Sequence, residues 1–464
     1  MRYEMNGLIA AMEEIDNKPV AVDADEAVEL VETVADDSAV VQADADEVGI
    51  SVSQVEDAVQ AGEELEDIAE VASEAVESGE GLDETAAEVA SIAIESIRNR
   101  LGIRGESRLV PATESFGNVN TRVMSTRLIV EGIGDTLKRI WAAIKAAAAR
   151  IWEKIKSFFA GLFNSTSGLI KLINGLRDRA RKLPTDAKIK DKKIKHSGIA
   201  RSISLKGKAN LGTYQEIAKN TVNLAGVSVA FGKIGRSVIQ AAENLASSDI
   251  NEANVKAYLQ STSSAAAEAD RVMAGAFTVA AAYLTGTGAT KAKGPKASKA
   301  KNVTTKHFGP FVNNSMLTLE LVSSAGGSNT WTISFSAPKD KVAEEVDALE
   351  PNEIVQVLEV SLKLAAALQD YKKTQGDMDA ITKSIQKVSE TVIKSAESIL
   401  NKTGSSTETR LGLAELKDSV NSTLQTLNTF SGRAPSLQFA LAKAGADYAS
   451  VALRNIGEKA FGGK

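Results

Sequence analysis

The charged residues of this chain are segregated by sign. Residues 1–114 contain 30 Asp and Glu against 6 Lys and Arg, a net charge of −24. Between Lys18 and Arg98 there are 24 acidic residues and no basic residue. Like charges at this density repel one another within the ~8 Å Debye length of physiological salt, and no local counter-charge offsets them. We therefore expect residues 1–114 to form an acidic, weakly ordered leader.

Local amphipathic helices are still expected inside this leader, because apolar residues recur there at helical spacing. The residues that carry this pattern are Ile68, Val71, Ala75, Val89, Ile92 and Ile97. With so much unbalanced charge, we expect these helices to fluctuate and to be weakly held.

The rest of the chain is basic. Residues 115–464 contain 30 acidic against 48 basic residues, a net charge of +18. Lys and Arg that neutralise phosphates release condensed counterions, so this body is expected to bind nucleic acid without sequence preference. The candidate contacts lie in two lysine-dense tracts: Lys188, Lys190, Lys192, Lys193, Lys195, Lys206 and Lys208, then Lys291, Lys293, Lys296, Lys299 and Lys301. Ordinary solubilising loops are the alternative interpretation.

Composition and periodicity predict a mainly α protein. Aromatic residues make up only 5% of the chain, and Ala, Ser, Lys and Glu are abundant, which is typical of long helices. Apolar spacing predicts helices over 127–182, 212–249, 251–289, 353–375, 378–402, 412–431 and 436–461. The lengths of the later helices favour an antiparallel bundle.

The segment 127–182 is the clearest amphipathic helix, with a stripe that includes Trp141, Trp152, Phe158 and Phe159. Such a stripe can pack on partner helices in the core, lie on a membrane surface, or leave its basic face to nucleic acid. We favour core packing, because downstream helices are available to cover the stripe.

A small antiparallel β insertion is expected among the helices. Residues 316–321 and 331–335 alternate between apolar and polar around Gly326-Gly327, which predicts a hairpin or a sheet of few strands. Ile199, Ile203 and Leu205 suggest further short strands. The second lysine tract, extended to Lys306, is interpreted as an exposed loop. The expected organisation is a leader (1–114), a basic amphipathic segment (115–182), a mixed region (183–338) and a C-terminal bundle (339–464).

Residue types for catalysis are scarce. The chain has no Cys and only two His, His196 and His307, which are interpreted as solvated polar residues. No phosphate-binding loop, nucleophile elbow, zinc-protease motif or calcium loop occurs. We therefore expect no enzyme activity, no metal site and no cofactor.

No secretory signal or membrane span is expected either. The N-terminus lacks a basic region followed by an apolar core. The longest uncharged run, 272–290, is interrupted by Gly and Thr, and we interpret it as a buried helix that ends at Gly286-Thr287-Gly288.

The leader is either a solubilising tail or a removable prosegment. At the point where the charge changes sign, Pro111 and Gly117 flank Ala112-Thr113-Glu114-Ser115, and this stretch is expected to be extended and accessible to a protease. That coincidence favours a prosegment.

This arrangement resembles the internal head (inner body) proteins of giant tailed phages related to phiKZ. The stretches that carry the resemblance are the acidic leader with 61–63, 79–85, 95–102, 114–117, 126–128, 131–132, 151–155, 157–159 and 162–167, so it covers about the first 180 residues. The resemblance implies processing by a prohead protease that prefers a small residue, any residue and Glu before the cut. Carried over, Glu114 precedes the scissile bond, Ala112 is the small residue and Ser115 is the new N-terminus.

The resemblance further implies a virion structural protein that is synthesised in the host cytoplasm and packed with DNA inside the capsid. Its expected partners are the prohead protease, other inner-body proteins and phage DNA. Two rivals stay open, namely a membrane-active helical protein ejected into the host and a prohead core or scaffold protein. At least nine other small-x-Glu matches in the leader leave the exact cut open, among them Ala24-Asp25-Glu26, Ala72-Ser73-Glu74, Ala75-Val76-Glu77, Ser78-Gly79-Glu80 and Ala93-Ile94-Glu95.

Overall fold

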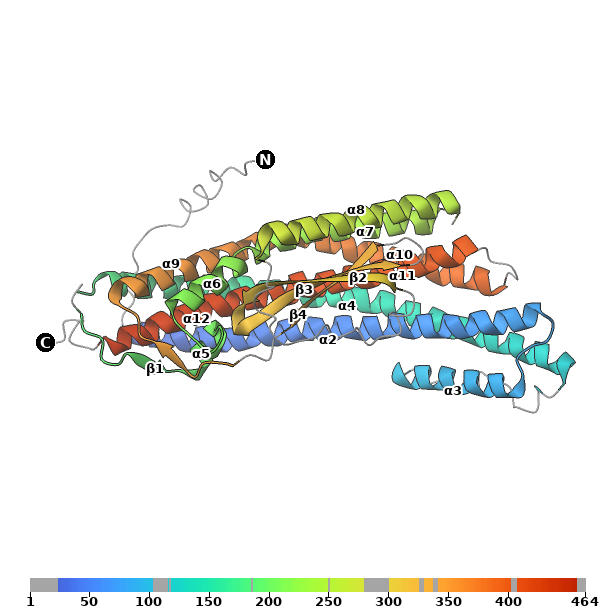
Figure 1. Cartoon of the computed structure of the whole chain (residues 1–464), viewed down its shortest axis with the longest axis horizontal. Helices are drawn as coiled ribbons and strands as arrows, with labels where there is room; N and C mark the ends of the chain where they lie inside the picture. Colours follow the sequence, from blue (N-terminus) through green and yellow to red (C-terminus); the bar gives the residue numbers. More distant parts are fainter. Residues whose placement is uncertain are drawn as a thin grey trace.

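Long helices run along one axis of an elongated molecule (Figure 1). The computed structural model describes residues 24–102, 116, 118–184, 187–248, 251–278, 300–324, 329–336, 341–401 and 407–456. The helices are α2 (Ala24–Glu77), α3 (Glu84–Arg100), α4 (Val119–Arg181), α5 (Ser197–Ile203), α6 (Leu211–Thr221), α7 (Leu224–Ser247), α8 (Glu252–Ala276), α9 (Pro351–Ala367), α10 (Gln375–Asn401), α11 (Thr407–Asn428) and α12 (Ala434–Asn455). The strands are β1 (Lys193–Lys195), β2 (Ala300–Phe311), β3 (Ser315–Ser324), β4 (Asn329–Ser336) and β5 (Glu345–Asp347).

The two longest helices, α2 and α4, pack side by side and antiparallel (Figure 1). The buried apolar side chains of α2 recur every three or four residues: Val41, Ala45, Val48, Val52, Val55 and Val59. Those of α4 do the same at Ile133, Leu137, Ile140, Ile144, Ala148, Ile151 and Ile155. This spacing, close to 3.5 residues, keeps one apolar seam facing a partner helix along its whole length.

The turn between α2 and α3 is attached to the first turns of α4, and so it joins the end of α2 to the beginning of α4. The Leu82 amide donates to Thr126 Oγ1 at 2.9 Å, and Asp83 caps α3 by accepting from the Ala86 amide at 2.7 Å. Gly81 has φ +65°, and a Cβ there would lie 2.8 Å from the backbone of Arg122. Only glycine combines that conformation with so close an approach.

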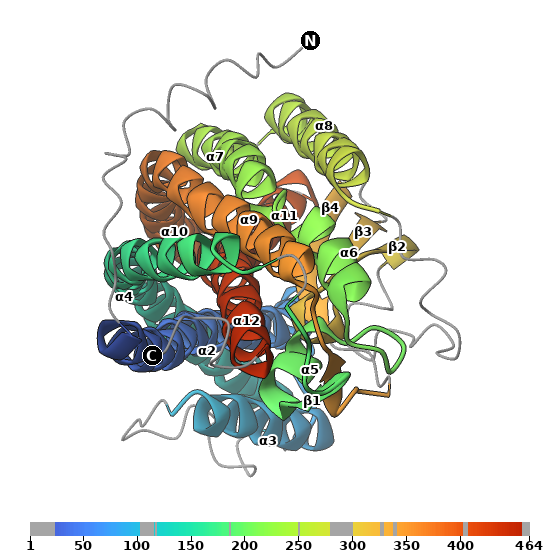
Figure 2. The ribbon, with the colours of Figure 1, turned by 90° about the vertical axis from the view of Figure 1, so that its left-hand side faces the viewer.

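The remaining helices complete the bundle around this pair. Seen end-on, α9, α10 and α12 lie against α4 and α2, with α7 and α8 beyond them (Figure 2). One continuous core cluster takes side chains from α2, α4, α9, α10, α11 and α12. Phe159 of α4 and Tyr371, in the 3-10 turn between α9 and α10, meet within it at 6.3 Å between ring centres.

The small sheet has the order β2-β3-β4, and both pairs are antiparallel. Leu317, Leu319, Trp331 and Ile333 are buried in a second core with residues of α7 and α8, including Met273. Trp331 Nε1 donates to Thr426 Oγ1 of α11 at 3.1 Å, which joins the sheet to the bundle. The two-residue periodicity of the sequence therefore predicted this hairpin correctly.

The predicted fold class, mainly α with long amphipathic helices and a small antiparallel sheet, is confirmed. Residues 41–100 of the leader pack more closely on the rest of the chain than the charge argument implied. Val48, Val52 and Leu65 are fully buried, and Arg100 pairs with Glu64 at 2.7 Å. The apolar seam offsets the charge repulsion because the acidic side chains lie on the other faces of α2, where water and the basic body reach them.

The expected amphipathic helix forms as α3, but of the three residues that carried its pattern only Ile97 is buried. Ala87, Ala90, Ile94 and Ile97 form the buried face of α3, whereas Val89 and Ile92 are exposed.

Several predicted boundaries also need correction. The helix expected over 212–249 is two helices, α6 and α7, and the one expected to reach 289 ends at Ala276 because the Phe277 ring packs on Phe308 and Phe311 of the sheet. The break expected after residue 431 is a π-helical turn, Thr429–Arg433, that joins α11 to α12. The Thr429 hydroxyl donates from this turn to Ile333 O at 2.9 Å.

Two short segments were assigned to the wrong structure. Ile199 and Ile203 lie in α5 and not in strands, because His196 Nδ1 accepts from the Ile199 amide at 3.2 Å and caps a helix there. Residues 300–306 belong to β2 and not to an exposed loop.

Candidate nucleic-acid interface and leader contacts

The first lysine tract leaves α4 and is anchored to the end of α12. The amides of Lys190 and Asp191 donate to Asn455 O at 3.0 Å and to Asn455 Oδ1 at 3.1 Å. Asn455 Nδ2 donates back to Asp191 O at 2.7 Å. One asparagine thus fixes the backbone of the tract, while its lysine side chains stay exposed.

The next residues form β1, which pairs antiparallel with β5. Lys193 lies opposite Asp347, and Lys195 lies opposite Glu345. Opposite charges across a strand pair attract each other, so these two lysines are partly neutralised within the fold.

The last two lysines of the tract flank a tight turn. Leu205 and Lys208 exchange backbone hydrogen bonds of 2.9 and 3.0 Å. Lys206 and Gly207 have φ of 51° and 75°, the conformation of a two-residue hairpin turn. The turn holds the exposed side chains of Lys206 and Lys208 away from the core.

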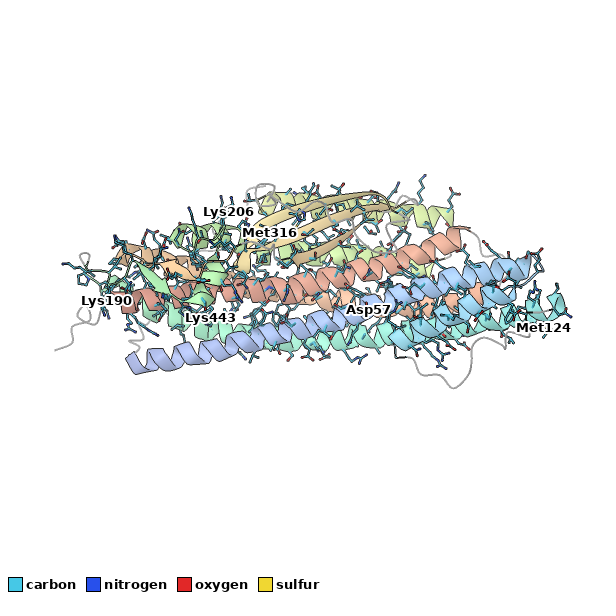
Figure 3. The ribbon with its side chains drawn as sticks, turned by 60° about the horizontal axis from the view of Figure 1, so that its bottom comes forward. Asp57, Met124, Lys190, Lys206, Met316 and Lys443 are labelled. Atoms are coloured by element: carbon cyan, nitrogen blue, oxygen red, sulfur yellow. The ribbon has the colours of Figure 1, made fainter. Side chains whose placement is uncertain are left out.

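We call these residues the lysine surface: Lys188, Lys190, Lys192, Lys193, Lys195, Lys206 and Lys208, all of them exposed. Within the described residues, Lys188, Lys190, Lys192 and Lys208 have no ion-pair partner. Figure 3 shows Lys190 and Lys206 in the half of the molecule that lies away from Met124.

The described residues do not show whether the second lysine tract lies near the lysine surface. Lys291, Lys293, Lys296 and Lys299 lie outside the described residues, as does the side chain of Lys301 in β2. Lys306, later in the same strand, forms an ion pair with Asp270 of α8 at 2.6 Å.

The leader contacts the basic body through ion pairs that sequence reasoning missed. Lys154 of α4 pairs with Glu47, and Arg433 pairs with Asp46, both at 2.8 Å. Lys417 of α11 pairs with Glu66. The signal that could have indicated these contacts is the regular apolar spacing from Val41 to Val59, which implies a partner helix for α2.

The Lys417–Glu66 pair is the most buried of these contacts. The Lys417 side chain is only 2% exposed, against 37% for that of Glu66. Burial lowers the pKa of Lys417 to about 8, and the charges of Glu63 and Asp418 oppose that shift. The leader thus supplies counter-charge to an ammonium group that lies inside the body.

The aromatic stripe of α4 is part of the core. Trp141, Phe158 and Phe159 are 1% exposed or less. In the folded chain they pack against neighbouring helices, so the predicted core packing of this stripe is confirmed. Among the described residues, no helix combines the length and the apolar character that crossing a bilayer requires.

The two histidines have structural surroundings. His196 caps α5, and His307 Nδ1 lies 3.0 Å from Thr318 Oγ1 on the neighbouring strand. In the part of the chain that the structure describes, no group of three or more His, Asp or Glu side chains is arranged to hold a metal ion.

The predicted cleavage residues, Ala112, Thr113, Glu114 and Ser115, lie outside the described residues. Other small-x-Glu matches can be placed. Those ending at Glu74, Glu77 and Glu95 lie within α2 or α3, whereas Ser78-Gly79-Glu80 lies in the turn between these helices.

No curated protein and no solved structure is significantly similar to the chain. The family model of the phiKZ-like phage internal head proteins matches residues 23–454. The match extends far beyond the first 180 residues, to which the resemblance had been assigned, and includes the lysine surface. The chain therefore belongs to the phiKZ-like phage internal head proteins, a family of structural proteins that lie inside the virion head in association with other capsid components.

Proposed function

We propose that this internal head protein is made as a precursor, that a prohead protease removes residues 1–114 by cutting after Glu114, and that the lysine surface contacts packaged DNA. The observation that carries the DNA part is the set of seven exposed lysines in the segment between α4 and α6, of which Lys190 and Lys206 lie in the same half of the molecule (Figure 3). The change in charge from −24 to +18 at residue 114 supports the processing part.

The position of the other matches supports Glu114 as the cut. A protease cleft binds extended backbone, and Glu74, Glu77 and Glu95 are held in helices. Of the matches cited above, Ser78-Gly79-Glu80 is the one that remains as a second exposed site, in a turn on the leader side of Glu114. A cut there would shorten the leader and leave the mature N-terminus unchanged.

Removal of the leader has a structural consequence. The α2 side chains that face α4 are buried apolar groups, each worth about 1.5–3 kcal/mol when taken out of water. The loss of α2 uncovers the seam of α4 and removes Glu66, the ion-pair partner of Lys417. Maturation is therefore accompanied by repacking of the body or by a new partner on α4.

The membrane-active alternative requires the Trp and Phe side chains of α4 to reach lipid, and in the full-length chain Trp141, Phe158 and Phe159 are buried. It therefore applies only to the chain from which the leader has been removed. The scaffold alternative differs from the proposal in its fate, since a scaffold leaves the head. Presence of the body in mature particles therefore supports the proposal, and its absence supports the scaffold alternative.

Peptide mass spectrometry of purified particles tests the processing. We expect the most N-terminal peptide to begin at Ser115, with peptides from residues 1–114 depleted relative to those of the body. An intact Met1, or absence of the whole chain from mature particles, would contradict the proposal.

DNA binding is tested on the full-length chain, in which the lysine surface is exposed. We expect Lys190→Ala/Lys192→Ala/Lys208→Ala to weaken binding to random duplex DNA by about tenfold or more near 50 mM salt. The slope of log K against log salt should become shallower by about 2 to 3, since each lost phosphate contact removes about 0.9. Fluorescence anisotropy across a salt series measures both.

The matched control is Lys156→Ala/Lys373→Ala/Lys383→Ala, which removes the same charge from lysines paired within their own helices with Glu153, Asp370 and Asp379. This control should bind DNA nearly as the unaltered chain does. Equal losses in both triple variants would show that net charge alone acts and that the lysine surface is no interface.

A further inference from the structure

The outer face of α3 is both acidic and apolar. Residues 74–97 contain seven acidic residues, all exposed, and no basic residue. On α3 itself, Val89 and Ile92 are 62% and 63% exposed, because the helix packs on the molecule with its other face, which contains Ala87, Ala90 and Ile94. We call Glu84, Glu88, Val89, Ile92 and Glu95 the acidic face.

The carboxylates on this face of α3 contribute to solubility, but the two exposed branched apolar side chains among them do not. Such a face is suited to a partner that offers positive charge around a small apolar contact.

The lysine surface offers that complementary chemistry. Lys206 and Lys208 flank the turn at Gly207, the Lys341 side chain packs against that glycine, and the next residue, Val342, is 44% exposed. Positive charge and an exposed apolar side chain therefore occur together on this surface.

Within one molecule the two surfaces cannot meet. The Leu82–Thr126 hydrogen bond holds the start of α3 beside the beginning of α4, near Met124, and the labelled lysines lie toward the opposite end (Figures 1 and 3). Lys154, Arg433, Lys417 and Arg100 form ion pairs with Glu47, Asp46, Glu66 and Glu64 of α2, and none of these four basic residues belongs to the lysine surface.

We propose that the acidic face of one precursor docks on the lysine surface of a second copy of this chain. Because the two surfaces differ, each molecule can offer one surface to one neighbour and the other surface to the next, so the contact links molecules into chains or closed assemblies. Exposed ion pairs are individually weak and screened by salt, so the association is reversible and declines at high ionic strength. It also places the leader of one copy over the DNA-binding surface of the next.

Sedimentation velocity of the full-length chain at about 50 and 500 mM salt tests this proposal. We expect the weight-average sedimentation coefficient to rise with concentration at low salt and to stay monomeric at high salt. Glu88→Lys/Glu95→Lys should weaken association at least tenfold, and Lys190→Glu/Lys192→Glu should do the same. Asp57→Lys/Glu252→Lys, a matched change in charge elsewhere on the exposed surface, should associate as the unaltered chain does.

The decisive arm mixes the two reversed variants. Each variant alone places like charges opposite each other at the changed positions, but in a mixture the reversed α3 of one variant faces positions 190 and 192 of the other with opposite charge. Association should return in the mixture. A chain that is monomeric at low salt, or a mixture that stays monomeric, overturns the proposal.

The docking shares its lysine surface with the proposed function but requires neither DNA nor cleavage. Glu88→Lys/Glu95→Lys leaves the lysines intact, so this variant should still bind DNA. A chain that binds DNA but never self-associates contradicts the docking alone. A chain that self-associates but ignores DNA contradicts the proposed function alone.

Discussion

Replacement of Val52 by aspartate is expected to lower the free energy of unfolding of the full-length chain by about 3–5 kcal/mol. Val52 lies in the middle of α2 and is fully buried against the neighbouring helices. A carboxylate there has no partner and loses its hydration, which is among the most costly single substitutions in a folded protein. Urea unfolding followed by circular dichroism measures the change.

The control is two residues away. Ile50 is on the same helix but is 60% exposed, so Ile50→Asp should change the free energy of unfolding by no more than about 0.5 kcal/mol. Both variants add one acidic residue to the same acidic segment. If they were equally harmless, α2 would not be a core element, and if they were equally harmful, charge repulsion in the leader would explain the effect.

Periodicity was enough to predict the regular parts of the fold. The stripe of α4, the hairpin of β3 and β4, and the positions of the C-terminal helices follow from apolar spacing, because burial on one face leaves a period of 3.6 or 2 in the sequence. Helix ends were less predictable. The end of α8 depends on Phe277 meeting Phe308 and Phe311, a tertiary contact that no local pattern encodes.

The packing of the leader was underestimated because the prediction rested on its net charge and not on the helical spacing of its valines. The valines at 41, 48, 52, 55 and 59 follow the three-or-four rule, but the argument from repulsion treated the segment as if no partner existed. Repulsion among exposed carboxylates is reduced by water and salt, whereas the seam gains from every buried valine. The counter-charges, Lys154, Arg433 and Lys417, lie 107 or more residues away in sequence from the acidic residues they pair with.

The candidate interface was predicted in part. Lysine density identified the first tract, and the fold exposes all seven of its candidate lysines. Sequence alone did not reveal that Lys193 and Lys195 lie opposite Asp347 and Glu345, because β5 is far from β1 along the chain. It also did not reveal that Lys306 is engaged by Asp270.

The second large expected effect concerns the backbone of α2. If α2 is built into the core, its amides exchange hydrogen only when the bundle opens, and their exchange should be at least about a thousandfold slower than in an unstructured chain. The matched reference within the same molecule is α4 at residues 140–158, against which α2 packs. Peptides from residues 48–65 should therefore be protected to a similar degree.

The most direct test of the central claim, that the acidic N-terminal region is a core element of the full-length protein, is this hydrogen-exchange measurement by mass spectrometry at neutral pH. Slow exchange at residues 48–65, matching that of residues 140–158, is the predicted result. Exchange at 48–65 within about tenfold of the unstructured rate, beside a protected α4, would mean that α2 is a loosely attached leader and would contradict the account.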